Sequence, residues 1–203
     1  STLLSYQHVE NLVTRITGVQ QLSDQKIWQI VNDKAVEIGR VWRIEAEETL
    51  NSKALSFPKI QEKVDIYDGE NREILVFEDA IQVRGQKENR VHKQKVIEET
   101  PMNPAEKPIR LVAKGKSPPV FTNVVMLQKK KRAFERMVAP IDEKGQETVS
   151  LPDMLKSRVI EEYGQATEPL PVVALTDGAQ VIRQHLHAVF GATLVIILDW
   201  YHL

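Results

Sequence analysis

A carboxylate interrupts an apolar row in the clearest strand of the sequence, EILVFEDAIQVRGQ (73–86). The two-residue repeat of a strand places Asp79 on one face with Leu75, Phe77, Ile81 and Val83. Burying a carboxylate without a partner is costly, so Asp79 needs a cation, a proton or hydrogen-bond donors. A half-exposed strand end is the alternative. Asp65 and Asp68 lie nearby, but only Asp79 belongs to a strong strand.

Two further aspartates follow short apolar segments in the last third of the chain. Asp177 follows PVVALT (171–176), Asp199 follows TLVIIL (193–198), and a helix is predicted between them over 179–190. Continuous apolar runs of this length, flanking a helix, indicate a βαβ unit with parallel, central strands. Open α/β sheets place their chemistry at the carboxyl ends of such strands. We therefore expect Asp177 and Asp199 at one edge of a sheet.

The acidic and histidine side chains of this region could instead form a zinc site. Asp199 and His202 could share a face of a helical turn, and His185 and His187 lie on the preceding helix. Their spacing matches no standard zinc pattern. A structural role for the Asp-x-x-His pair fits better.

The first 56 residues are predicted to be helical. One helix is expected from Ser5 to Thr17, closed by Gly18, and a long second helix follows the N-cap Ser23. An apolar stripe marks the second helix and consists of Trp28, Val31, Ala35, Ile38 and Trp42. Two helices joined by a glycine-containing turn are compatible with a helix-turn-helix, and an ordinary helical hairpin fits the same pattern.

The rest of the chain is predicted to be a linker over 57–72 and an α/β domain over 73–203. Residues 86–118 carry prolines and many charges with little periodicity, which indicates a long, flexible insertion between strands. A strand is expected at 120–128, more regular structure near 133–141, and a helix over 151–163. The predicted order is an antiparallel group of strands, a helix and a parallel βαβ unit.

Composition permits several functions and excludes a few. The 203 residues are 42% hydrophobic and 27% charged, as in globular proteins, and no apolar run is long enough for a membrane span. The absence of cysteine excludes disulfides and thiolate metal sites, and it favours a cytoplasmic location. The net charge of −1 is not that of a dedicated nucleic-acid binder. Two basic islands, at 84–95 and 129–132, fit either a solvated surface or a local anion contact.

The end of the sequence resembles a known family of enzymes. TDGAQVIRQHLHAVFGATLVIILDWYHL (176–203) is similar to the segment around the second catalytic aspartate of bacterial insertion-sequence and Mutator-like DDE transposases. The similar features, in order, are Asp177-Gly178, a helix ending in the aromatic Phe190, a strand, and Asp199 separated by two residues from His202. FEDAIQVRGQK (77–87) resembles the family's strand with the first aspartate, which is Asp79 here.

The resemblance implies a ribonuclease-H-like mixed sheet, within an α/β (overall α+β) protein, preceded by helices that hold DNA. It implies that Asp79 and Asp177 are catalytic and bind Mg²⁺ or Mn²⁺ for phosphoryl transfer on DNA. The family's third carboxylate, a glutamate on a later helix, has no counterpart before Leu203. The chain is therefore expected to be truncated at its C-terminus and inactive as given.

The same resemblance implies double-stranded DNA, both element ends and target, as the partner, with self-association on the DNA in a bacterial, nucleoid-associated location. Candidate DNA contacts from a helix-turn-helix are Gln25, Lys26 and Gln29. Those from the rest of the chain are Lys129, Lys130, Lys131, Arg132 and His202. No membrane partner is expected.

Two other classes of protein compete with this interpretation. One is a non-catalytic DNA-binding protein that uses the N-terminal helices, with the α/β part serving dimerisation. The other is an unrelated α/β enzyme with acidic strand ends, such as a phosphatase or a nucleotide-binding domain. Against the last, the sequence has neither a glycine-rich phosphate loop nor an Asp-x-Asp motif after a strand.

Overall fold

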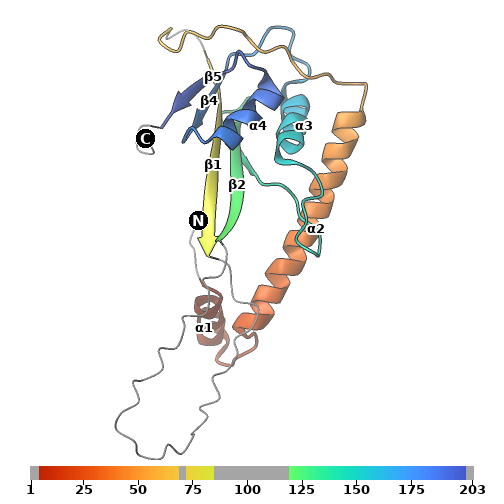
Figure 1. Ribbon diagram of the computed structural model, residues 1–203. Coiled ribbons are helices and arrows are strands. Elements are labelled where there is room, and N and C mark those ends of the chain that lie inside the picture. Colours follow the sequence, from red (N-terminus) through yellow and green to blue (C-terminus); the bar gives the residue numbers. More distant parts are fainter. Residues whose placement is uncertain (1–4, 69–71, 85–118, 200–203) are drawn as a thin grey trace, which may run out of the picture. The chain divides into compact units, whose positions relative to one another are not determined.

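The computed structural model describes residues 5–68, 72–84 and 119–199 (Figure 1). Its elements, in chain order, are α1 (Tyr6–Thr17), α2 (Asp24–Asn51), β1 (Ile74–Arg84), β2 (Pro119–Gln128), β3 (Phe134–Met137), α3 (Leu151–Tyr163), β4 (Val172–Thr176), α4 (Gln180–Phe190) and β5 (Val195–Leu198). One compact unit comprises the described residues up to Asp79 and from Asn123 onward, and the strand segments between belong to a second. The insertion predicted over 86–118 and His202 lie outside the described residues.

The bounds predicted for the helices are confirmed because their capping residues act as the sequence suggests. The side chains of Ser5, Ser23 and Ser150 each accept a hydrogen bond from the backbone N–H three residues later, which begins α1, α2 and α3. Gly18 ends α1 with a φ of 78°, in the left-handed region that glycine tolerates.

The apolar stripe predicted on the second helix is largely exposed to solvent. Trp28, Val31 and Ile38 are 52%, 47% and 43% exposed. The buried residues of α2 are Ile27, Gly39 and Ala46. Ala46 lies 18 positions after Trp28, which is five turns at about 100° per residue, so the two residues lie on the same side of α2. The stripe is therefore covered toward its C-terminal end, where Trp42 is half-buried and Ala46 is buried, and exposed up to Ile38.

Five strands form one mixed sheet in the order β3-β2-β1-β4-β5. β1 pairs in parallel with β4, from Ile74 opposite Val172 to Glu78 opposite Thr176. β4 pairs in parallel with β5, and β2 pairs antiparallel to β3. The mixed α/β fold and the parallel βαβ unit predicted from the sequence are thus confirmed. The prediction that both strands of this unit are central holds for β4 but not for β5, which is the edge strand among the described residues.

One face of this sheet is covered by α3 and α4 (Figure 1). The core between them joins Val76, Val125 and Leu127 of the strands to Leu155, Val159, Ile182 and Leu186 of the helices. α2 packs on α3, where Arg158 is 9% exposed and binds Glu45 at 2.7 Å, Glu161 at 2.7 Å and Glu135 at 3.4 Å. A buried cation is tolerated there because three carboxylates surround it.

The segment predicted as a linker takes part in the core. Phe57 and Ile60 pack against the buried cluster, and the Phe57 ring lies 6.2 Å from that of Phe190. Ile60 also forms a parallel bridge with Leu170 just before β4. The connection between α2 and β1 is therefore attached to the sheet domain at these points.

The other face of the sheet carries half-buried apolar side chains, among them Phe77, Met126, Leu175 and Ile197. In the described part of the chain no helix packs on this face (Figure 1). None of the described helices combines the length and apolar character needed to cross a lipid bilayer.

Candidate active site at the carboxyl edge of the parallel strands

Three aspartates follow equivalent positions of three neighbouring strands. Glu78 of β1 and Leu198 of β5 both lie opposite Thr176 of β4. The next residue of each strand is an aspartate, at positions 79, 177 and 199. Because adjacent strands lie about 4.8 Å apart, this register brings the three backbones together at one edge of the sheet. The sequence prediction that Asp177 and Asp199 share an edge is consistent with this register.

Asp79, Asp177 and Asp199 line one cavity at that edge, with a volume of about 460 Å³. Its apolar walls are Phe77, Met126, Leu175, Ile197 and Leu198. The volume falls in the range of small-ligand sites, roughly 300 to 1,000 Å³. An apolar wall beside carboxylates lowers the local dielectric and strengthens their attraction for a cation.

The turn after β4 holds the carboxylate of Asp177 in place. Its Oδ1 accepts hydrogen bonds from the Ala179 N–H at 2.9 Å and from the Thr176 hydroxyl at 3.3 Å. Gly178 has a φ of 83°, which a residue with a side chain rarely adopts, and this conformation lets the chain turn directly into α4. The other carboxylate oxygen of Asp177 has no hydrogen-bond partner among the described residues.

The carboxylate buried in β1 is Glu78, which the sequence analysis did not single out. Asp79 is exposed, whereas Glu78 is only 2% exposed and points to the helix-covered face with Val76. The apolar row that contains Asp79 lies on the sheet face that no described helix covers. The helices α3 and α4 cover the other row instead. Glu78 and Asp79 are neighbours on one strand and point to opposite faces. The sequence does not show which of the two is buried, because this depends on the face that α3 and α4 cover.

Glu78 has two polar partners within the core. Its Oε1 lies 2.9 Å from Nδ1 of His185 on α4 and accepts a hydrogen bond from Asn123 of β2 at 3.3 Å. Burial raises the pKa of the Glu78 carboxyl, the contacts with His185 and Asn123 oppose that rise, and the nearby Asp177 adds to it. This cluster therefore lies directly beneath the edge that carries the aspartates.

The donor set at this edge suits a hard divalent cation. Mg²⁺ prefers oxygen ligands and is usually held by one or two carboxylates together with water and substrate phosphates. Asp79 and Asp177 can supply two such carboxylates. Within the ranges that the structure describes, no group of three or more Asp, Glu, His or Cys side chains is arranged to hold a metal ion. His185, considered for zinc, is engaged with Glu78 instead.

The predicted DNA contacts lie away from this cavity. Gln25, Lys26 and Gln29 are exposed on the first turns of α2, where the Lys26 ammonium donates to the Gln29 side chain at 3.3 Å. Residues 129–132 form the turn between β2 and β3. Neither group lines the cavity that contains Asp79 and Asp177.

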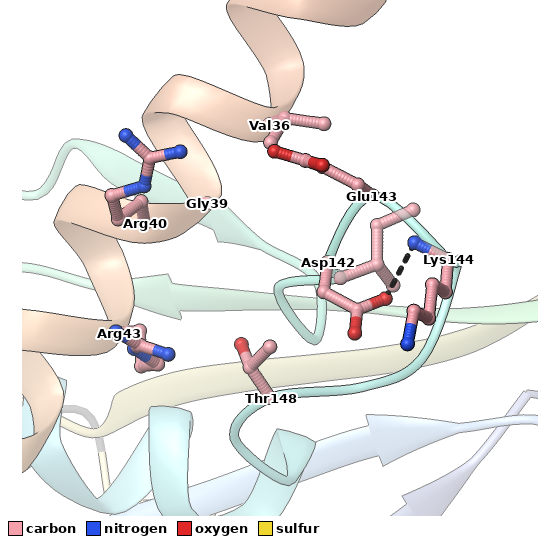
Figure 2. Close-up of a pocket in the computed structure, with 9 residues that line it drawn as sticks. Val36, Gly39, Arg40, Arg43, Asp142, Glu143, Lys144 and Thr148 are labelled. Carbon is pink, nitrogen blue, oxygen red and sulfur yellow. Dashed lines mark hydrogen bonds between the residues drawn. The ribbon is translucent and has the colours of Figure 1, made fainter.

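A second cavity lies between α2 and the loop over 140–148 (Figure 2). Gly39 packs against this loop, and a side chain there would begin 3.4 Å from the carbonyl oxygen of Ile141, at ordinary van der Waals distance. Arg43 points into the space toward Thr148, and its Nε has no hydrogen-bond partner among the described residues. Asp142 accepts hydrogen bonds from the backbone N–H groups of Lys144 and Gln146. Its carboxylate therefore organises the loop.

Comparison with known proteins gives no relative for this arrangement. No family model, no curated protein sequence and no solved structure matches the chain.

Proposed function

We propose that this chain carries the catalytic centre of a DDE-type DNA transposase, with Asp79 and Asp177 as its first two metal-binding carboxylates. The observation that carries the proposal is their shared position: they directly follow paired residues of adjacent parallel strands and line one cavity. The element order adds support, because three strands, a helix and a βαβ unit, with an acid on β1 and another just after β4, are expected of a ribonuclease-H-like domain.

Each part of the site has a role in this proposal. Asp79 and Asp177 hold Mg²⁺ or Mn²⁺, which when bound supplies charge neutralisation at the phosphate and activation of the attacking oxygen. The Ala179 N–H occupies Oδ1 of Asp177, so Oδ2 is the oxygen left for the ion. The walls formed by Phe77, Leu175 and Ile197 limit the access of bulk water to the reacting phosphate.

Metal binding and strand nicking test this proposal separately. Calorimetric titration with Mn²⁺ measures binding, and conversion of supercoiled plasmid to nicked circles measures cleavage. We expect Asp79→Asn and Asp177→Asn each to weaken Mn²⁺ binding at least tenfold and to remove any nicking. Asp33→Asn, an exposed acid on α2, is the matched control and should change neither. Equal Mn²⁺ binding by all four proteins would exclude the site.

A non-catalytic DNA-binding protein is the second candidate, favoured by the absence of a three-group metal site among the described residues. Here the exposed Gln25, Lys26 and Gln29 of α2 would contact the major groove. Deletion of the N-terminal helices is a poor test, because the α2 residue Glu45 pairs with Arg158 of α3. Substitution of the three exposed residues by alanine keeps the fold. The second candidate predicts loss of DNA binding in that triple variant.

A further inference from the structure

Three cations line a cavity near the start of β1, away from the aspartates. Arg72 lies just before β1, and Lys130 and Arg132 belong to the turn between β2 and β3. Within the described residues, none of the three has an ion-pair partner. The lining contains one acidic residue, Glu73. The cavity, about 540 Å³ in volume, therefore has an excess of positive charge that the described residues leave uncompensated.

The turn that carries two of these cations is attached to the end of α3. The Lys130 N–H donates to the Glu162 carboxylate at 3.1 Å, and the Lys130 ammonium lies 5.8 Å from the centre of the Tyr163 ring. The Tyr163 hydroxyl donates to the carbonyl of Gln128 at 2.7 Å. Burial raises the pKa of Tyr163 to about 12, so this donor keeps its proton. The turn is thus preformed.

Lys129 also lines the cavity, but its charge is paired with two carboxylates that hold the turn. Its ammonium lies 3.0 Å from Glu135 and 3.8 Å from Glu162. Lys129 therefore has a structural role, whereas Lys130 and Arg132 have charges that remain for a ligand.

Arg132 occupies a backbone position that favours glycine. Its φ of 62° makes it the one non-glycine residue with positive φ in the part of the chain that the structure describes. The Arg132 N–H donates to the Lys129 carbonyl, and the Lys129 N–H donates to the Ala133 carbonyl, as in a type I turn followed by a left-handed residue. A side chain in this conformation is less favourable than glycine, because its Cβ lies too close to the following carbonyl oxygen. The sequence has an arginine at this position although glycine would fit the backbone better.

We propose that Arg72, Lys130 and Arg132 bind a backbone phosphate of duplex DNA, on the same molecule that reacts at Asp79 and Asp177. The binding of one DNA molecule at both sites rests on the proposed function. Leu75 of the basic cavity and Phe77 and Asp79 of the acidic one belong to one row on one sheet face. Ile74 and Asp79 are five positions apart in β1, or about 16 Å at about 3.3 Å per residue. Along a duplex this corresponds to about five base pairs.

The test is duplex binding without any metal, measured by fluorescence anisotropy of a labelled 20-base-pair DNA in EDTA, from 50 to 200 mM KCl. Arg132→Gly removes the cation while giving the turn its preferred residue, and Lys130→Gln removes the second charge. We expect each variant to bind about three- to tenfold more weakly at 50 mM KCl, and to lower the salt slope of log K by about 0.9. Lys144→Gln, in the cavity beside α2, is the control and should bind as the parent does.

Thermal denaturation separates a lost contact from a damaged fold. Arg132→Gly should melt at the same temperature as the parent protein or higher, because glycine relieves the backbone cost. Unchanged affinity and salt slope in both cation variants would overturn the inference. So would displacement of the duplex by submillimolar inorganic phosphate at constant ionic strength, since the cavity would then be a site for a free anion. Loss of Mn²⁺ binding in the aspartate variants is a separate result, so the two proposals can fail independently.

Discussion

The N-terminal helices and α4 of the sheet domain are all amphipathic, yet they use their apolar sides differently. α4 buries Ile182, Leu186 and Val189 against the sheet. α1 buries no residue, and α2 leaves Trp28 and Ile38 about half exposed. Helical periodicity therefore predicts a helix and its apolar face equally well in both regions. It does not say whether anything within the chain covers that face.

The largest effect that follows from this comparison concerns core leucines. Leu186→Ala on α4 should lower the free energy of unfolding by about 2 to 5 kcal/mol, because the side chain is fully buried and its removal leaves a cavity. Ile38→Ala on the exposed stripe should change it by no more than about 0.5 kcal/mol. Urea unfolding followed by circular dichroism measures both. A large loss in the Ile38 variant would mean that the stripe is covered.

Ion pairs give the next contrast. Arg158→Met leaves the carboxylates of Glu45, Glu135 and Glu161 without their shared cation and should cost about 2 to 3 kcal/mol. This is less than for a fully buried pair, because Glu45 and Glu161 are about half exposed. Lys34→Met breaks the solvent-exposed Lys34–Glu37 pair and should cost less than about 0.5 kcal/mol. The comparison fails if chemical denaturation gives the two variants equal losses.

The N-cap serines of α3 and α1 allow the same substitution to be compared in the two regions. Ser150→Ala removes the N-cap of α3 and should lower the free energy of unfolding by about 1 kcal/mol, since α3 is part of the core. Ser5→Ala removes the equivalent bond from α1, which contributes no buried residue, so only local fraying should increase. Thermal melts report the first change. Amide hydrogen exchange of His8 and Val9 reports the second, and a falling melting temperature in the Ser5 variant would contradict it.

The smallest effect is a dependence on pH. The pKa of Glu78 is raised in the folded protein above its ordinary value of 4.5, mainly by burial, so the folded state binds the extra proton more tightly. The contribution of Glu78 is then most favourable below pH 4.5 and declines as the pH rises toward the folded pKa. The difference in unfolding free energy between the parent and Glu78→Gln should fall over that interval. A difference that grows with pH would show that His185 dominates instead.

The sequence was sufficient to predict the local structure of this protein. Its capping serines, its helix-ending Gly18 and the continuous apolar runs before Asp177 and Asp199 each act over a few residues, so the elements and the parallel βαβ unit followed from them. Contacts between distant segments could not be read in the same way. The attachment of Phe57 and Ile60 to the core depends on the path of the chain, which periodicity does not encode.

For the candidate site, the sequence indicated which acids follow strands but not which way each side chain points. Asp79 does lie in an apolar row, as predicted. The sequence did not show that this row lies on the sheet face without a described helix, where Asp79 is exposed. The burial of Glu78 against His185 needs α4 to lie on that face, and no local pattern specifies this. A histidine in the middle of an amphipathic helix, next to core positions, was the only available sign.

The pairing of β1 with β4 also determines when the aspartates can meet during folding. Asp177 and Asp199 are joined by a local βαβ unit, whose strands can associate soon after α4 forms. Ile74 must find Val172 across a much longer stretch of chain, and the entropy of closing such a loop delays that step. The first aspartate therefore reaches its neighbours only when the long-range pairing is complete, so an assembled carboxylate edge reports that β1, β4 and β5 have paired.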